Sequence, residues 1–221
     1  MGNCFIQVTH ATKQFKETIA LNDITISFEK NKIHGIIGRN GSGKTVLFKC
    51  ICGLMHLDKG TITVRNKIVG VDMDIPPHLG IIIEAPGFLP NYSGLQNLKF
   101  LAGINRTIRL SDIKESLKQV GLDPDMNKHV GKYSLGMRQR LGIAQAIMEK
   151  PDILILDEPM NGLDNDGVFE IRKLLLQLKS LGTTILLASH NKEDIQALCD
   201  TVLEMDKGKI IAKNGNRDVI F

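Results

Sequence analysis

The sequence has 221 residues, of which 43% are hydrophobic and 24% are charged, and these proportions are ordinary for a soluble globular protein. No apolar run approaches the ~20 residues of a membrane-spanning helix and no signal peptide is visible, so we expect a cytoplasmic protein, although it could dock on a membrane protein. The net charge of +4 is mildly basic, but no block of Lys and Arg is interleaved with aromatic residues, so we expect no nucleic-acid partner. The four cysteines have neither a C-x-x-C nor a zinc-site spacing and are expected to be free, reduced and partly buried.

Short strands are expected through the first part of the chain, with one helix among them. Apolar and polar residues alternate over 5–9 and 24–28, and the run over 33–37 is apolar enough to be buried. Asn31 tolerates the left-handed conformation of the turn that leads into that run. The other elements expected here are a helix that starts near Val46 and ends at Gly53, a hairpin of residues 61–64 and 67–69, and a buried strand over 80–83.

Helical periodicity replaces the strand pattern from Pro86 onward. Pro86, Gly87 and Pro90 break regular structure, and no convincing strand follows before residue 150. Ser111 is expected to cap a helix that Gly121 ends. We therefore interpret residues 85–150 as a helical insertion.

The last part of the chain alternates strands with helices. Most of these strands are uniformly apolar, a pattern typical of a parallel sheet that is covered on both faces. The sequence thus predicts an α/β fold in a single domain, with a core of residues 1–84 and 151–221 and a helical subdomain of residues 85–150. The expected strands are 153–156, 184–188, 201–205 and 209–212, and the expected helices are 168–181 and about 192–199.

A phosphate-binding pattern, G-x-x-x-x-G-K-[ST], lies between the buried strand 33–37 and the helix that follows it. Its glycines let backbone N–H groups turn inward around a phosphate, and the start of the helix adds partial positive charge. Lys44 can reach the β- and γ-phosphates of a nucleotide, and the Thr45 hydroxyl can ligate Mg²⁺. The pattern is formed by Gly38, Arg39, Asn40, Gly41, Ser42, Gly43, Lys44 and Thr45.

Polar residues follow two of the apolar strands at the point where each strand ends. Asp157 and Glu158 follow the strand 153–156, and His190 follows the strand 184–188. The carboxyl ends of the strands are the edge where ligands bind in an open α/β sheet. We expect Asp157 to hold Mg²⁺ through water, Glu158 to accept a proton from an attacking water, and His190 to hydrogen-bond phosphate or water.

A further helix begins at Ser134, and its start is a second possible anion site. From this stretch alone, a plain capped helix is the better interpretation. Together, however, the motifs resemble those of the ATP-binding cassette (ABC) ATPases, which are P-loop NTPases, and the resemblance covers residues 5–212. The matching segments are Gly38–Thr45 (Walker A), Tyr133–Met137 (signature), Ile153–Glu158 (Walker B and catalytic Glu), Asn161–Asp164 (D-loop), His190 (switch histidine) and Phe15 (the aromatic that stacks on adenine).

The resemblance implies an N-terminal antiparallel β subdomain, a helical subdomain, and ATP and Mg²⁺ as ligands. Three residues depart from the family pattern: Leu135 replaces a signature glycine, Met137 replaces the signature glutamine, and Glu84 replaces the Q-loop glutamine. Ser134 and Gly136, which in the family approach the γ-phosphate held by the opposite subunit, are retained. The Glu84 segment is similar to that of the exporters of bacitracin and lantibiotics, and in Glu84 we expect a further catalytic residue and Mg²⁺ ligand.

The function implied by the resemblance is that of the ATPase subunit of a bacterial exporter of an antimicrobial peptide, a drug or a similar amphipathic substrate. Two chains, or a pair of related cassettes, would close around ATP and drive a separate transmembrane permease, which would hold them at the inner face of the cell membrane. The alternative is a soluble ABC-type ATPase that acts on the ribosome or on DNA. Those relatives usually carry tandem cassettes or a long coiled coil, and this chain has neither.

A GTP switch is a third hypothesis, because Asn191–Asp194 fits the guanine-reading pattern N-K-x-D and Asp164–Gly167 fits D-x-x-G. Both patterns are short and match often by chance. The two matches also lie too close together to accommodate a switch segment, a helix, a strand and a loop. The simpler interpretation is that Asn191–Asp194 opens a helix, with acids favourable in its first turn.

Overall fold

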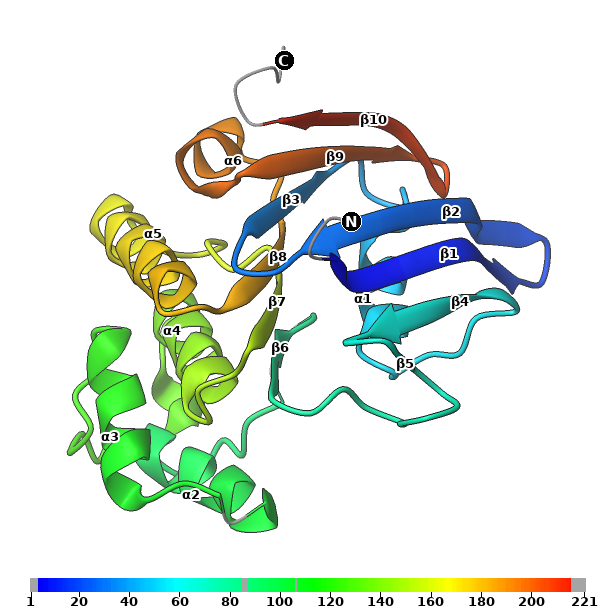
Figure 1. Ribbon diagram of the computed structural model, residues 1–221. Coiled ribbons are helices and arrows are strands. Elements are labelled where there is room, and N and C mark those ends of the chain that lie inside the picture. Colours follow the sequence, from blue (N-terminus) through cyan, green and yellow to red (C-terminus); the bar gives the residue numbers. More distant parts are fainter. Residues whose placement is uncertain (1–3, 85–86, 106, 216–221) are drawn as a thin grey trace.

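The computed structural model describes residues 4–84, 87–105 and 107–215, which form two β-sheets and a set of helices (Figure 1). The four-stranded sheet contains β1 (Cys4–Phe15), β2 (Thr18–Glu29), β4 (Lys59–Val64) and β5 (Lys67–Ile68). The six-stranded sheet contains β3 (Ile33–Ile37), β6 (Leu79–Ile82), β7 (Ile153–Asp157), β8 (Thr184–Ala188), β9 (Thr201–Asp206) and β10 (Lys209–Gly215). The α-helices are α1 (Lys44–Ile51), α2 (Gly94–Asn105), α3 (Leu110–Gln119), α4 (Leu135–Ile147), α5 (Asn165–Ser180) and α6 (Lys192–Leu198).

The six-stranded sheet is the mainly parallel core sheet that the sequence predicts. Its strand order is β10-β9-β3-β8-β7-β6, and every neighbouring pair is parallel except β10 and β9. The strands β3, β7 and β8 are buried almost throughout, because both faces of the sheet are covered. Alternate residues of β7 enter different cores, with Ile153 and Ile155 on one side and Leu154 and Leu156 on the other.

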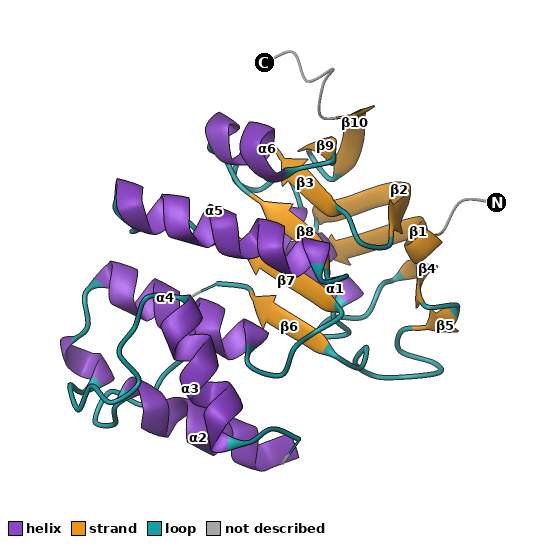
Figure 2. Ribbon diagram, turned by 60° about the vertical axis from the view of Figure 1, so that its left-hand side comes forward, coloured by secondary structure: helices purple, strands orange, loops and turns teal. Residues whose placement is uncertain are grey.

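Different layers cover the two faces of this sheet (Figure 2). One face packs against α4, α5 and α6, and its core continues into α2 and α3. The other face packs against α1 and the inner side of the four-stranded antiparallel sheet. The α1 side chains Leu47, Phe48 and Ile51 are almost fully buried between the two sheets. The helix that follows the phosphate-binding pattern is therefore held rigidly from both sides.

Two strands are much longer than the sequence indicates. The expected strands 5–9 and 24–28 are only parts of β1 and β2. The pairing of these strands shifts register between Val8 and Ala11, and His10 and Asp23 have positive φ angles of 50° and 55°. A bulge of this kind interrupts the alternation of side chains on which the sequence-based prediction relies. The extension brings Phe15 to the end of β1.

The described residues between β6 and β7 form α2, α3, α4 and a short 3₁₀ helix (Val130–Lys132). In Figure 1 these helices lie at the end of the molecule that is distant from the four-stranded sheet. The expected capping role of Ser111 is wrong, because α3 already begins at Leu110. The backbone N–H of Arg109 instead donates to the carboxylate of Asp112, at 3.0 Å. Pro86, the predicted break before this segment, lies outside the described residues.

The cysteines are free thiols, as expected, and three of the four are buried. Burial raises the pKa of Cys50 to about 11 and the pKa values of Cys52 and Cys199 to about 12, so these thiols are protonated near neutral pH.

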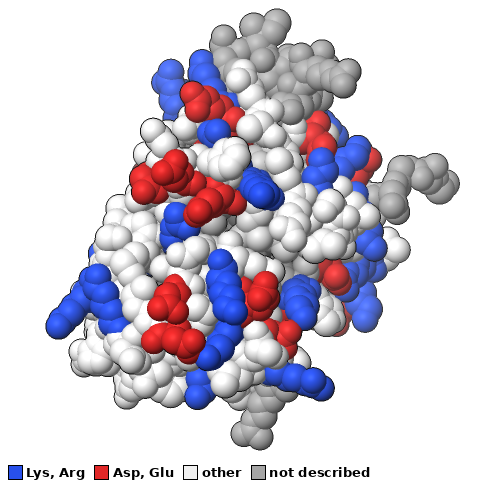
Figure 3. Space-filling model, turned by 90° about the vertical axis from the view of Figure 1, so that its left-hand side faces the viewer, with Lys and Arg blue, Asp and Glu red and all other residues white. Residues whose placement is uncertain are grey.

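On the face that carries α3 and α5, positive and negative side chains are interspersed (Figure 3). In the part of the chain that the structure describes, no helix is long and apolar enough to cross a membrane.

Candidate active site

The phosphate-binding pattern forms a loop between β3 and α1, as predicted. Gly41 and Gly43 have positive φ angles of 80° and 106°, which side chains with a Cβ rarely adopt. A Cβ at Gly43 would lie 2.4 Å from the carbonyl oxygen of Ala20, whereas a Cβ at Gly41 would meet no atom within 4 Å. The loop is thus closely packed on β2 at one glycine and open at the other. It borders a cleft of about 720 Å³.

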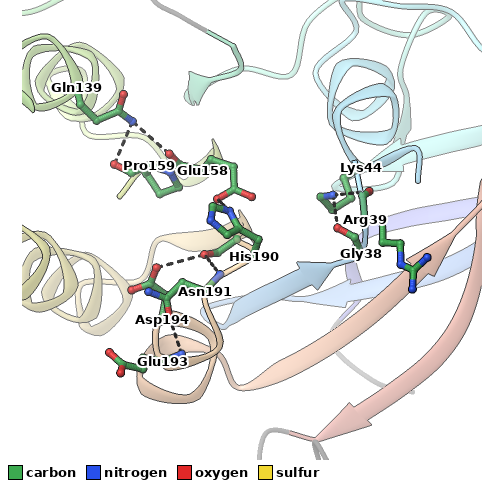
Figure 4. Close-up of polar contacts among 11 residues, drawn as sticks. Gly38, Arg39, Lys44, Gln139, Glu158, Pro159, His190, Asn191, Glu193 and Asp194 are labelled. Carbon is green, nitrogen blue, oxygen red and sulfur yellow. Dashed lines mark hydrogen bonds and ion pairs between the residues drawn. The ribbon is translucent and has the colours of Figure 1, made fainter. Parts of the chain in front are cut away.

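Two side chains of this loop have hydrogen-bonding capacity that suits an anionic ligand. The Lys44 ammonium is largely buried and donates to the carbonyl oxygens of Gly38 and Arg39, at 2.7 and 3.2 Å (Figure 4). The Ser42 hydroxyl is buried and has no hydrogen-bond partner among the described residues. A buried polar atom without a partner is rare in proteins, so the Ser42 hydroxyl is available to hydrogen-bond a ligand of this loop. Both side chains fit a bound polyphosphate.

Thr45 and Asp157 meet on the floor of the cleft. The Thr45 hydroxyl, in the first turn of α1, donates to Asp157 Oδ2 at 2.6 Å, and Asp157 is the last residue of β7. Hydroxyl and carboxylate oxygens are suitable ligands for Mg²⁺, which keeps several waters and takes few protein ligands. No group of three or more His, Cys, Asp or Glu side chains that could hold a metal ion occurs among the described residues. What Thr45 and Asp157 offer is two oxygen atoms in contact, of the kind that suits Mg²⁺.

Glu158 and His190 are brought together from neighbouring strands. His190 Nδ1 lies 2.8 Å from Glu158 Oε2, within hydrogen-bond distance (Figure 4). Glu158 has a positive φ of 52°, and its backbone N–H donates to the carbonyl oxygen of Ala188 at 2.9 Å. The carboxylate thus stands at the edge of the sheet on a constrained backbone, and Glu158 lines the cleft. A carboxylate that is held beside an imidazole at the expected position of a terminal phosphate is suited to accept a proton.

Glu84 also lines the cleft, but its carboxylate is bound by a lysine. Lys49 Nζ, on α1, lies 2.6 Å from Glu84 Oε1, and the Glu84 side chain is 66% exposed. Glu84 has a positive φ of 63°, which is uncommon for a residue other than glycine. The next two residues of the predicted bend, Ala85 and Pro86, lie outside the described part of the chain. Without ligands, Glu84 therefore forms an ion pair rather than joining Asp157.

Phe15 lines the cleft, as do Thr18 and Ala20 of β2. Phe15 is 44% exposed, and the Lys13 ammonium lies 5.6 Å from its ring centroid. Lys13 does not line the cleft and is paired with Asp58 at 2.8 Å. The ring therefore has a cation nearby and exposed surface in the cleft, where an aromatic base could stack.

Ser134 and Gly136 are two of the predicted site residues that do not line this cleft, and the others are Gly38, Arg39 and His190. The Ser134 side chain caps α4, as expected, and accepts a hydrogen bond from the backbone N–H of Met137 at 3.2 Å. Ser134 is exposed, and so is Leu135, at 61%. A Cβ at Gly136 would lie 2.8 Å from the carbonyl oxygen of Gly162, so this turn packs closely on the loop after Glu158. Within one chain, the start of α4 is a separate surface.

Sequence reasoning missed four residues of the cleft wall, Thr18, Ala20, Val46 and Gln139. Gln139, on α4, lines the cleft, and its amide donates to the carbonyl oxygen of Pro159 at 3.0 Å. No helical spacing indicated the position of Gln139, because residues three or four apart share a helix face and Gln139 is five residues from Ser134. The D-x-x-G match is a helix cap, because the Asp164 carboxylate accepts from the backbone N–H of Gly167 at 2.9 Å. Asn191 likewise caps α6, in agreement with the helix-start interpretation.

Comparison with known proteins identifies the class to which this fold and cleft belong. The family described as ABC transporter matches residues 21–161. The chain is 46% identical over 205 residues to the ABC transporter ATP-binding protein YybJ of Bacillus subtilis (strain 168), a match that covers 93% of this chain and 94% of YybJ. It is 40% identical over 212 residues to the bacitracin transport ATP-binding protein BcrA of Enterococcus faecalis, covering 93% and 68% of the two chains.

Solved structures agree with this assignment. The cassette cbiO1 from Clostridium perfringens, part of the ABC transporter complex cbiONQ, has a TM-score of 0.84 and 28% identity, covering 98% of this chain and 90% of cbiO1. A dimeric ATP-binding cassette in a post-hydrolysis state with ADP and Pi has a TM-score of 0.86 at 20% identity, covering 97% of this chain and 100% of the cassette, a likeness of fold. The chain belongs to the ATP-binding proteins of the ABC transporter family. It is the ATP-binding and ATP-hydrolysing subunit of an ABC transporter rather than a GTP switch.

Proposed function

We propose that ATP is hydrolysed in the cleft with its polyphosphate on the loop Gly38–Thr45 and its base on Phe15. The observation that carries the proposal is that this loop and the Glu158–His190 pair line one cleft or its edge. Glu158 accepts the proton of the attacking water, and His190 orients Glu158 and hydrogen-bonds the terminal phosphate. Lys44 and the N-terminus of α1 stabilise the negative charge on the phosphates. The subdomain of residues 85–150 supplies the surface at the start of α4.

Thr45 and Asp157 are the residues that would hold Mg²⁺. The metal would neutralise phosphate charge and polarise the bond that is broken. In the structure, Thr45 and Asp157 already contact one another, so their oxygen atoms are close enough to share one ion. Glu84 is the proposed additional ligand, and it becomes available when it leaves Lys49.

The proposed role of Glu84 predicts opposite effects of two substitutions on magnesium dependence. Glu84→Gln removes a charged ligand, so the Mg²⁺ concentration at half-maximal ATPase activity should rise about two- to fivefold, since exposed charge interactions contribute at most about 1 kcal/mol. Lys49→Met releases the carboxylate and should lower that concentration. ATP binding without Mg²⁺ should be equal or tighter in Glu84→Gln, because one negative charge is lost. A magnesium titration of the three proteins measures the effect, and superimposable curves would leave Glu84 with no role at the metal.

We further propose that two cassettes act together. Ser134 and Gly136 are exposed or partly exposed at the start of α4 and do not line the cleft of their own chain. The N-terminus of a helix, with the Ser134 hydroxyl at its cap, is suited to a phosphate. A second copy, or a related cassette, would supply this surface to the nucleotide bound by the first. Dimers are known for a cassette of the same fold.

The permease and the transported substrate complete the proposal. The relatives include the bacitracin transport proteins BcrA and the lantibiotic transport protein SrtF of Streptococcus pyogenes, which is 34% identical over 206 residues and matched over 93% of this chain and 89% of its own length. We propose that this chain powers export of an amphipathic antimicrobial peptide through a separate membrane permease. It would then lie in the cytoplasm, peripheral on the inner face of the cell membrane. No nucleic-acid partner is proposed.

Loss of ATP binding by this chain should make the cell that expresses it more sensitive to the exported compound. Replacing the chain by its Lys44→Ala variant removes the phosphate-binding cation, so the sensitivity of the cell to bacitracin or to a lantibiotic should rise several-fold. The control is Glu204→Gln, which changes an exposed residue of β9 and should have no effect. The inhibitory concentrations of both compounds measure this, and affinity purification of the tagged chain from solubilised membranes should recover a multi-span protein. Unchanged sensitivity together with recovery of ribosomal proteins instead would support the soluble alternative.

A further inference from the structure

The loop that carries His190 is attached to α5 by a buried polar network. Asp194, in the first turn of α6, is only 1% exposed, and its Oδ1 accepts from Arg172 Nη2 and Nε at 2.6 and 2.8 Å. Its other oxygen, Oδ2, accepts from the Ser189 hydroxyl at 3.2 Å. The Ser189 hydroxyl in turn accepts from the backbone N–H of Asn191 at 3.1 Å. Figure 4 shows Asp194 beneath the turn from which His190 projects.

This network leaves the turn little freedom. A buried carboxylate is stable only when it is paired and hydrogen-bonded, and both oxygens of Asp194 have such partners. The two contacts from the planar guanidinium of Arg172 orient the carboxylate as well as neutralising it. The oriented carboxylate fixes the Ser189 hydroxyl, which holds the backbone of Asn191. The residues on both sides of His190 are therefore fixed.

Both members of the Glu158–His190 pair depend on the same helix. The loop that follows Glu158 ends at Asp164, which caps α5 by accepting from the backbone N–H of Gly167 at 2.9 Å. Arg172 lies further along α5 and reaches Asp194 on α6. Since α5 packs against the core sheet, it provides a common support for the carboxylate and for the imidazole.

We propose that Asp194, Arg172 and Ser189 are positioning residues for ATP hydrolysis, which act by holding His190 at hydrogen-bond distance from Glu158. The inference rests on the proposed roles of Glu158 and His190. These three residues do not line the cleft, and their hydrogen bonds reach the site through Ser189 and Asn191, the two neighbours of His190. Their loss should lower the rate of the chemical step and leave nucleotide affinity unchanged.

Two substitutions test the network at different points. Ser189→Ala removes the hydroxyl that bonds both Asp194 and the backbone of Asn191, and it leaves the Arg172–Asp194 ion pair in place. Asp194→Asn weakens the ion pair itself. Each should lower kcat about 10- to 100-fold, since misplacement of a catalytic group by about 1 Å can cost that much, with KM for ATP changed less than about twofold. Lys179→Met is the matched control, because Lys179 also lies on α5 and pairs with Asp200, just after α6, at 2.5 Å. It should leave kcat within about twofold of the unmodified chain.

A double-mutant cycle with His190→Ala separates positioning from a general loss of stability. In the His190→Ala background, Ser189→Ala should have almost no further effect on kcat, because the side chain that it positions is absent. An undiminished effect in that background would overturn the inference. A normal kcat in Ser189→Ala would also overturn the inference, even if Asp194→Asn is too unstable to purify. A normal kcat in His190→Ala alone would instead contradict the proposed function. The rise in melting temperature with ATP confirms that each variant is folded and binds nucleotide.

Discussion

Glu158→Gln should lower the rate of ATP hydrolysis by about 10²- to 10⁴-fold and leave ATP binding intact, because removal of a general base typically has an effect of this size. The amide has the same shape as the carboxylate but cannot accept the proton of the attacking water. Glu158 lies 2.8 Å from His190, and its backbone N–H is bonded to Ala188, so the variant backbone should keep its position. The steady-state ATPase rate and the equilibrium binding of ATP measure the two effects.

The same variant should accumulate an ATP-bound dimer, because the step that opens the dimer is blocked. Size-exclusion chromatography with and without ATP detects this species. Glu204→Gln is the control, since Glu204 is an exposed acid on β9 that does not line the cleft. If Glu158→Gln hydrolysed ATP at a nearly normal rate, Glu158 would not be the base.

The phosphate-binding loop and the parallel sheet could be predicted because local signals specify them. The strands 33–37 and 184–188 occur over the predicted residues. In an α/β fold, a short and continuously apolar run is typical of a parallel strand that is buried on both faces. The expected positions of Asp157, Glu158 and His190 followed from the rule that ligands bind where parallel strands end. That Glu158 and His190 lie within hydrogen-bond distance, at 2.8 Å, is a finding of the structure that this rule does not contain.

The partners of the site residues could not be predicted, because they come from distant parts of the chain. Lys49 was an ordinary polar residue of a helix, yet it forms an ion pair with Glu84. Asp194 was expected to be one of the favourable acids in a first helical turn, but it is buried and paired with Arg172 from another helix. Sequence periodicity reports which face of an element is apolar and contains no information on which charged side chains meet.

Ser134→Arg should abolish most ATPase activity without affecting the cleft of the chain that carries it. Arginine at this position puts a long side chain on the surface that would face the partner's nucleotide, and Ser134 does not line the cleft of its own chain. The variant should therefore bind ATP normally and lose about 10²-fold or more in rate, the loss expected when a preorganised phosphate-stabilising group is removed. Lys44→Ala should be inactive for the opposite reason, since its own cleft has lost the phosphate-binding cation.

The central claim, that one chain binds the nucleotide and a second chain completes the site, is tested most directly by mixing these two inactive variants. In a mixed dimer, the Ser134→Arg chain supplies an intact cleft and the Lys44→Ala chain supplies an intact α4 start, so one of the two sites is whole. The ATPase rate of the mixture should rise well above that of either variant, toward about a quarter of the unmodified rate if dimers form at random and each site acts alone. Mixed dimers that form and are no more active than either parent would contradict the two-chain site.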